Sequence, residues 1–169
     1  MVILGIDPGS RQTGYAVIVM SGGHLRRLDG GVLRPPRTDS LGPRLLALHD
    51  GISDVIRAVK PDAVAMEECF MGRFARAALV LGHARGALMM AVLTEGVPLF
   101  EYAPRLVKMA AAGTGAASKA QLQAMIPRLV QAVPKNISAD EADALAVAVC
   151  HAHRARPLSR AAATVKVLK

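Results

Sequence analysis

The sequence VILGIDPGSRQTGYAVIVM, residues 2–20, contains two β-type segments separated by a polar turn. Residues 2–6 form a continuous aliphatic run that a Pro-Gly pair closes, which is typical of a strand buried on both faces. Residues 13–20 form the second run, and a Ser-Gly-Gly turn leads from it into a third run at residues 25–33. These patterns predict an antiparallel meander at the start of the chain.

Helices and strands alternate after this meander. Apolar side chains at three-and-four spacing predict a helix over residues 41–59, with Asp39 or Ser40 as its N-cap. The other predicted elements are short strands at 63–66 and 99–102, a long helix at about 73–94 between them, and two final helices that begin with capping boxes at 118–121 and 138–141.

Together these elements predict an α/β fold with a five-stranded mixed sheet, the antiparallel meander first, flanked by helices. We expect one domain at residues 1–153. Residues 154–169 contain basic side chains and no acid, so they are expected to form a solvated basic tail.

Small residues recur every four positions on the long helix, at Ala78, Gly82 and Gly86. They would give the helix a flat side that another helix can approach closely. Two interpretations remain open from the sequence, namely packing onto the sheet and a two-fold contact with a second subunit.

The composition favours a polyanionic partner. The chain of 169 residues has 21 Lys and Arg against 13 Asp and Glu, a formal net charge of +8. Nucleic acid is the expected partner rather than a membrane, because no basic amphipathic segment stands out and no apolar run reaches the ~20 residues that span a bilayer. Cys69 and Cys150 lack metal-ligand spacing and are expected to be reduced, as in a cytoplasmic protein.

Carboxylates at predicted strand and helix ends suggest a metal site. Asp7 and Glu67 each end a short apolar strand, and parallel neighbouring strands would place both at one end of the sheet. Asp140 and Asp143 share a helix face, although the helix dipole alone would explain acids in a first turn. Clustered like charges need a cation, and hard oxygen ligands favour Mg²⁺ or Mn²⁺; four carboxylates would balance two divalent ions.

Two further acids are ambiguous. Glu68 would point to the opposite sheet face from Glu67 if the strand continues. Glu141 is expected to reach back to the backbone of Ser138 in the capping box.

The chain resembles the RuvC family of Holliday-junction resolvases over about residues 1–153. The segments that carry the resemblance are GIDPGSRQTGYAV at 5–17, AMEECFMGRFARAALVLGHARG at 65–86, FEYAPRLVK at 100–108, SKAQLQAMI at 118–126 and SADEADALAVAVCHAH at 138–153. The resemblance implies a ribonuclease H-like fold and a homodimer that cuts four-way DNA junctions with Mg²⁺ or Mn²⁺. It also implies symmetric nicks that leave 5′-phosphate and 3′-hydroxyl ends, and a branch-migration motor as a further partner.

The resemblance also assigns site residues. It makes Asp7, Glu67, Asp140 and Asp143 the acidic tetrad, which settles Glu67 over Glu68. The other matched positions are Lys108 and Lys119, for DNA binding and, at Lys119, catalysis, and Phe70, a junction-contacting aromatic. Phe70 beside Arg73 and Arg76 suits stacking on an unpaired base, although a core position is its simpler interpretation. Lys119 lies at a predicted helix N-terminus, where it could meet a phosphate or simply face solvent.

Three other functions are compatible with parts of the pattern. An actin-like or sugar-kinase-like ATPase also begins with a strand, an Asp and a Gly-Ser turn, but it needs two such lobes. A DNA-binding module without activity would not need all four acids. A related ribonuclease H-like nuclease could act on RNA–DNA hybrids or on replication forks instead.

Overall fold

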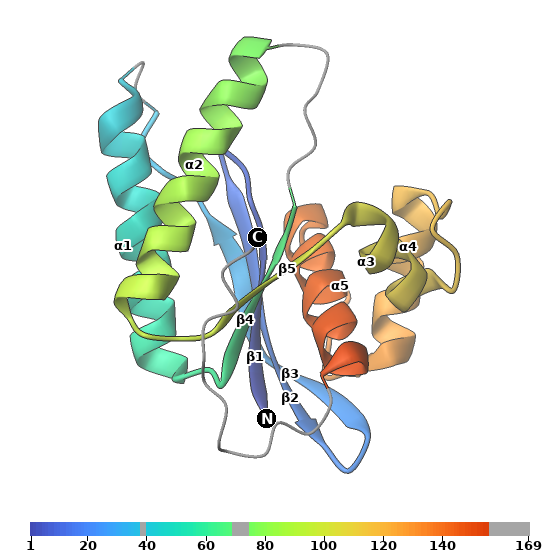
Figure 1. Ribbon diagram of the computed structural model, residues 1–169. Helices are drawn as coiled ribbons and strands as arrows, with labels where there is room; N and C mark the ends of the chain where they lie inside the picture. Colours follow the sequence, from blue (N-terminus) through green and yellow to red (C-terminus); the bar gives the residue numbers. More distant parts are fainter. Residues whose placement is uncertain (38–39, 69–74, 156–169) are drawn as a thin grey trace.

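A computed structural model describes residues 1–37, 40–68 and 75–155 of the chain. Strands and helices alternate much as the sequence predicts (Figure 1). In chain order the elements are β1 (Val2–Asp7), β2 (Thr13–Ser21), β3 (His24–Leu33), α1 (Leu41–Val59), β4 (Ala63–Glu67), α2 (Ala75–Thr94), β5 (Leu99–Tyr102), α3 (Pro104–Ala112), α4 (Lys119–Leu129), β6 (Val130–Gln131) and α5 (Ala139–Arg154).

The strands form one mixed sheet in the order β5-β4-β1-β2-β3-β6. The antiparallel meander is confirmed, since β2 pairs antiparallel with both β1 and β3. β4 lies parallel to β1, and β5 parallel to β4. The predicted number of five strands is wrong for the described residues, because β6 adds a sixth at the edge beside Leu25 and Arg26. β6 is two residues long and follows α4 directly, so it shows no alternating pattern from which a strand is predicted.

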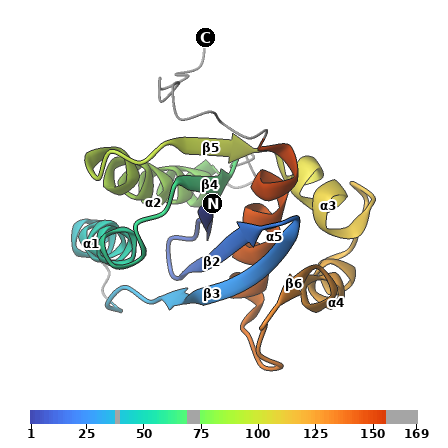
Figure 2. The ribbon, with the colours of Figure 1, turned by 90° about the horizontal axis from the view of Figure 1, so that it is seen from below.

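Helices cover both faces of the sheet (Figure 2). α1 and α2 lie on one face, and α5 lies on the other with α3 and α4 outside it. α5 is almost wholly buried from Ala144 to Ala152, because it is sandwiched between the sheet and the two outer helices. Each face therefore has its own aliphatic core, which fits a chain with only 3% aromatic residues.

The predicted helix starts agree closely with the structure. Ser118 forms the full capping box with Gln121, and Ser138 accepts a hydrogen bond from the Glu141 backbone N–H. α1 begins after Ser40 and ends at Lys60, whose left-handed conformation (φ 46°) allows its N–H to donate to the Ile56 carbonyl.

The small-residue side of α2 does not pack onto the sheet. Gly82 and Gly86 are exposed, and a Cβ added at either would meet no atom within 4 Å. The helix buries a different side, which includes Ala84 and Leu88. By length and composition α2 could cross a membrane, contrary to the expectation that no segment reaches that length, and only 22% of its apolar window is buried. α2 thus leaves the apolar side chains of Leu79, Met90 and Leu93 uncovered.

A buried hydrogen bond joins β5 to α5. The Tyr102 hydroxyl lies 2.7 Å from Nδ1 of His151, whose ring also packs against Phe100 at 4.6 Å between centroids. His151 is 1% exposed, and burial lowers its pKa from 6.5 to about 4. The imidazole is therefore neutral at pH 7 and shares one hydrogen bond with the Tyr102 hydroxyl.

This burial predicts a pH-dependent stability. The contribution of His151 to the free energy of unfolding is fully present above pH 6.5 and is lost as the pH falls toward 4. In that range the unfolded chain binds a proton at His151 more readily than the folded one does. The loss should amount to about 3 kcal/mol at ~1.4 kcal/mol per pKa unit. When the free energy of unfolding is measured with urea between pH 4 and 8, His151→Gln should lack this part of its dependence on pH. His24→Gln, at an exposed position, should keep it, and an unchanged slope in His151→Gln would contradict the assignment.

Candidate active site

Two of the predicted acids lie at one end of the sheet. β1 and β4 pair in parallel, with Ile6 opposite Met66, so Asp7 and Glu67 are the next residues on neighbouring strands. Both strands run toward the upper end of Figure 1. The condition that these strands are parallel neighbours is met, and both carboxylates lie partly exposed where the strands end.

The other two acids reach the same place through close helix–sheet contact. Gly14 is paired with Asp7 across the β1–β2 ladder, and a Cβ on Gly14 would lie 2.0 Å from the Asp140 backbone oxygen. The first turn of α5 therefore touches the backbone beside Asp7. Asp140 and Asp143 both belong to this end of the helix.

Electrostatics tie the acids into one cluster. The pKa of Asp7 rises from 3.8 to about 7, mainly through burial and then through the negative charges of Asp143 and Glu67, with Asp140 adding to the rise. Burial also raises the pKa of Glu67, and Asp143 adds to it. Each of the four carboxylates thus takes part in the same repulsion, which favours a bound cation.

Lys119 and Lys108 oppose this repulsion. The Lys119 ammonium lies 2.5 Å from Oδ2 of Asp143, and this hydrogen bond raises the lysine pKa. Lys108, half-buried on α3, lowers the pKa of Glu67 together with Lys119. The simpler expectation that Lys119 only faces solvent is not met, because its charge is directed into the acidic cluster although its side chain is 59% exposed.

The four carboxylates are the kind of ligand that a divalent cation prefers, but their side chains do not converge on one point. Across residues 1–37, 40–68 and 75–155, no three His, Cys, Asp or Glu side chains stand close enough together to hold a metal ion. Two of the oxygens are occupied by other donors, since Asp143 accepts from Lys119 and Asp140 accepts from the Gln12 amide at 2.5 Å. Carboxylates that repel one another are hard oxygen ligands and fit a divalent cation, which would have to displace these two donors.

The remaining predicted residues are placed as follows. Phe70 and Arg73 lie outside the described residues. Arg76 is exposed in the first turn of α2. Glu68 is exposed, and its backbone N–H donates to the Tyr102 carbonyl.

The expectation for Glu141 is wrong. Its backbone N–H bonds to Ser138 as a cap requires, but its carboxylate accepts from Nε of Arg27 at 2.7 Å instead of reaching back to the Ser138 backbone. A guanidinium is the stronger partner, because a hydrogen bond between two charged groups is about twice as strong as a neutral one.

A family model described as "Crossover junction endodeoxyribonuclease RuvC" matches residues 3–151. The chain belongs to the RuvC family. It is 49% identical to the crossover junction endodeoxyribonuclease RuvC of Photobacterium profundum over 157 residues, which is 93% of this chain and 90% of the relative. It is 48% identical to the RuvC of Maricaulis maris, with 93% of each chain covered.

Solved structures agree with the RuvC assignment. Thermus thermophilus RuvC in complex with a Holliday junction substrate superposes with a TM-score of 0.83 at 35% identity, over 90% of this chain and 93% of that one. The yeast mitochondrial Holliday junction resolvase Ydc2 has a TM-score of 0.64 at 14% identity over 88% and 76% of the two chains, which shows the fold alone. The expected fold class is confirmed.

Sequence reasoning missed two polar side chains next to the RuvC acids. Gln12 lies in the turn between β1 and β2 and bonds to Asp140 across 128 residues of sequence. Arg27 bonds to Glu141 across 114 residues. A local pattern carries no signal for such contacts, because neither residue belongs to a motif with its partner.

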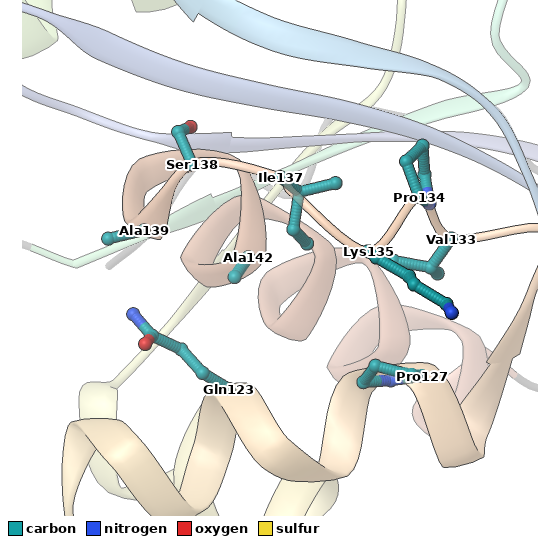
Figure 3. A pocket seen from close by; sticks show the side chains of 9 residues that line it. All are labelled: Gln123, Pro127, Val133, Pro134, Lys135, Ile137, Ser138, Ala139 and Ala142. Atoms are coloured by element: carbon teal, nitrogen blue, oxygen red, sulfur yellow. The ribbon is translucent and has the colours of Figure 1, made fainter.

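The protein also has a hollow outside the acidic cluster (Figure 3). It has a volume of about 280 Å³ and lies between α4 and the start of α5. Most of its lining is apolar, with Pro127 and Ala142 on facing helices and Lys135 at its rim. None of the four acids lines it, so it is not the candidate active site.

The raised pKa of Asp7 predicts that this carboxylate destabilises the protein when no cation is bound. The contribution of Asp7 to folding is most favourable below pH 4 and is lost as the pH rises through about 7. Asp7→Asn should therefore raise the free energy of unfolding at pH 8 in EDTA by about 1–3 kcal/mol. This is less than the full ~1.4 kcal/mol for each unit of pKa shift, because water still reaches Asp7 and screens its charge. Asp54→Asn, at an exposed position on α1, is the control and should change little. An Asp7→Asn protein less stable than wild type at pH 8 would contradict the interpretation.

Proposed function

We propose that this protein is a Holliday-junction resolvase, a crossover junction endodeoxyribonuclease that makes paired nicks in strands of like polarity during homologous recombination and repair. The observation that carries the proposal is the cluster of Asp7, Glu67, Asp140 and Asp143 at one end of a sheet whose chain belongs to the RuvC family. The products would carry 5′-phosphate and 3′-hydroxyl ends.

The four acids would hold the metal ions of the reaction. Asp7 and Glu67 would supply oxygens from the strand ends, and Asp140 and Asp143 from α5. Two Mg²⁺ ions, or Mn²⁺ in their place, would activate a water molecule and stabilise the departing 3′ oxygen. Burial of Asp7 makes its free carboxylate costly, so its charge is best satisfied when cations are bound.

Lys119 and Lys108 would bind the DNA backbone at this site. Lys119 lies at the N-terminus of α4, where the backbone N–H groups and the ammonium would meet the same phosphate of bound DNA. Its ion pair with Asp143 holds the ammonium within the acidic cluster before DNA arrives. Lys108, on α3, would place a positive charge near both Glu67 and the DNA phosphate and so reduce the repulsion between them.

The active protein would be a homodimer, because one tetrad per chain must nick two strands related by a two-fold axis. The exposed apolar side of α2 is the proposed contact. It presents Leu79 at 62% exposure, Met90 at 57% and Leu93 at 44%, with Gly82 and Gly86 between them. These positions follow three-and-four spacing, so a partner helix could lie along the glycines and cover the larger side chains.

Three finer points complete the proposal. Phe70, flanked by Arg73 and Arg76, would stack on an unpaired base at the junction centre. A branch-migration motor would act on the same junction as a further partner. The site of action would be the cytoplasm.

The proposal predicts metal-dependent cleavage of branched DNA. Wild-type protein should nick a mobile four-way junction in Mg²⁺, spare a linear duplex and lose activity in EDTA. Asp7→Asn should bind the junction but reduce cleavage by at least ~1,000-fold, because a cation ligand is lost while the DNA surface remains. Asp54→Asn should cut normally. Equal cutting of duplex and junction by the wild type would refute the proposed substrate.

The dimer contact can be tested at its glycines. Gly86→Glu has room within its own chain, since a Cβ there meets nothing within 4 Å, so it should leave the fold intact and separate the subunits by burying like charges at the contact. Gly42→Glu on α1 is the matched control, because its added Cβ is equally free. Sedimentation should show a monomer for Gly86→Glu and a dimer for Gly42→Glu. A dimeric Gly86→Glu protein would place the contact elsewhere.

A further inference from the structure

β3 contains a bulge that reverses the direction of its side chains. Val17 of β2 is paired with Asp29, and the next residue, Ile18, is paired with Arg27, so Leu28 has no partner. Such an extra residue turns the following side chains to the opposite face. Arg27 pairs with Ile18, which belongs to the core beneath α5, and Gly30 pairs with Ala16 of that same core.

Without the bulge, strict alternation from Arg27 would place Asp29 under α5. Asp29 instead pairs with Val17, which belongs to the core on the α1 side, and it hydrogen-bonds to Tyr15 there. The bulge therefore removes a negative charge from beneath α5 and puts a glycine in its place.

The vacated space holds the Glu141 carboxylate. A Cβ on Gly30 would lie 2.7 Å from Oε1 of Glu141, too close for any other residue without a shift. Arg27 donates from Nε to this oxygen at 2.7 Å and from Nη2 to the Gly30 carbonyl at 3.0 Å. The two side chains are only 16% and 7% exposed, so the ion pair is largely shielded from water.

Glu141 lies between Asp140 and Asp143 in the first turn of α5. Its backbone N–H bonds to Ser138, and its side chain bonds to Arg27, so both ends of this residue are fixed. The helix turn is consequently tied to β3 through Arg27. Any rotation of this turn about the helix axis would break the Arg27 contact and redirect both aspartates.

We infer that Arg27 is a positioning residue for the nuclease reaction. Its ion pair with Glu141, seated over Gly30, fixes the rotation of the first turn of α5 and thereby the direction of Asp140 and Asp143. Arg27 touches neither of these acids in any described contact and acts through Glu141. This inference rests on the proposed function.

The test compares Arg27→Met, Arg27→Lys and Glu141→Gln, each made in the protein of 169 residues. Single-turnover cleavage of a mobile junction in Mg²⁺ gives the rate, and junction titration in Ca²⁺ gives the affinity, at a temperature where unfolding curves show each variant folded. Arg27→Met should cleave about 10- to 100-fold more slowly with affinity within about threefold, because misdirected ligands impair the reaction more than DNA contact. Arg27→Lys should recover part of the rate by restoring a charge opposite Glu141. Glu141→Gln, which weakens the same pair, should slow Arg27→Met little further when combined with it.

The matched control is Arg57→Met, which breaks the Arg57–Glu95 ion pair of 2.6 Å between α1 and the end of α2. It should lose stability at most and cleave at the wild-type rate. The inference is overturned if folded Arg27→Met cleaves at the wild-type rate, if its loss equals that of Arg57→Met, or if the loss lies in affinity alone. A wild-type protein that cannot cleave junctions would instead overturn the proposed function, and with it the role given to Arg27.

Discussion

The approach of α5 to the backbone of β1 and β2 is the constraint on which the rest of the structure depends. Gly5 and Gly14 face this helix, and a Cβ at either would lie about 2 Å from an α5 carbonyl oxygen, at 2.2 Å and 2.0 Å. No side chain separates helix from sheet at these points. Asp140 and Asp143 can therefore lie near Asp7, and the alanine-rich sequence of α5 follows from the same lack of space.

The close approach of α5 to the sheet brings like charges together, and neighbouring basic and amide side chains donate hydrogen bonds to these acids. Buried like charges raise the pKa of Asp7 to about 7, so the acidic cluster is under strain without a counter-ion. Lys119 and Gln12 satisfy one oxygen each of Asp143 and Asp140. Arg27 neutralises Glu141, which would otherwise add a fifth negative charge behind the helix turn. Some of the excess basic residues thus form ion pairs with these acids, and the net charge of +8 still attracts the phosphates of DNA.

The apolar surface of α2 connects the fold to the proposed assembly. A helix that covers one face of a sheet normally exposes polar side chains outward, yet Leu79, Met90 and Leu93 face solvent in a single chain. Since soluble proteins rarely leave large apolar patches uncovered, the second subunit proposed above would cover these side chains and supply a second nuclease site. The acidic cluster and α2 would then contribute to one function from different parts of the molecule.

The sequence by itself determined most of the elements, although not α3 or β6. It also determined the strand-end positions of Asp7 and Glu67, the shared helix face of Asp140 and Asp143, and the caps at Ser118 and Ser138. These depend on local spacing and on motifs, which are written in neighbouring residues. The sixth strand, the exposure of the α2 glycines and the partners of Gln12, Arg27 and Glu141 were decided by the tertiary structure alone. Contacts across more than a hundred residues depend on sheet order, on a one-residue bulge and on how closely a helix can approach, and no local pattern encodes these.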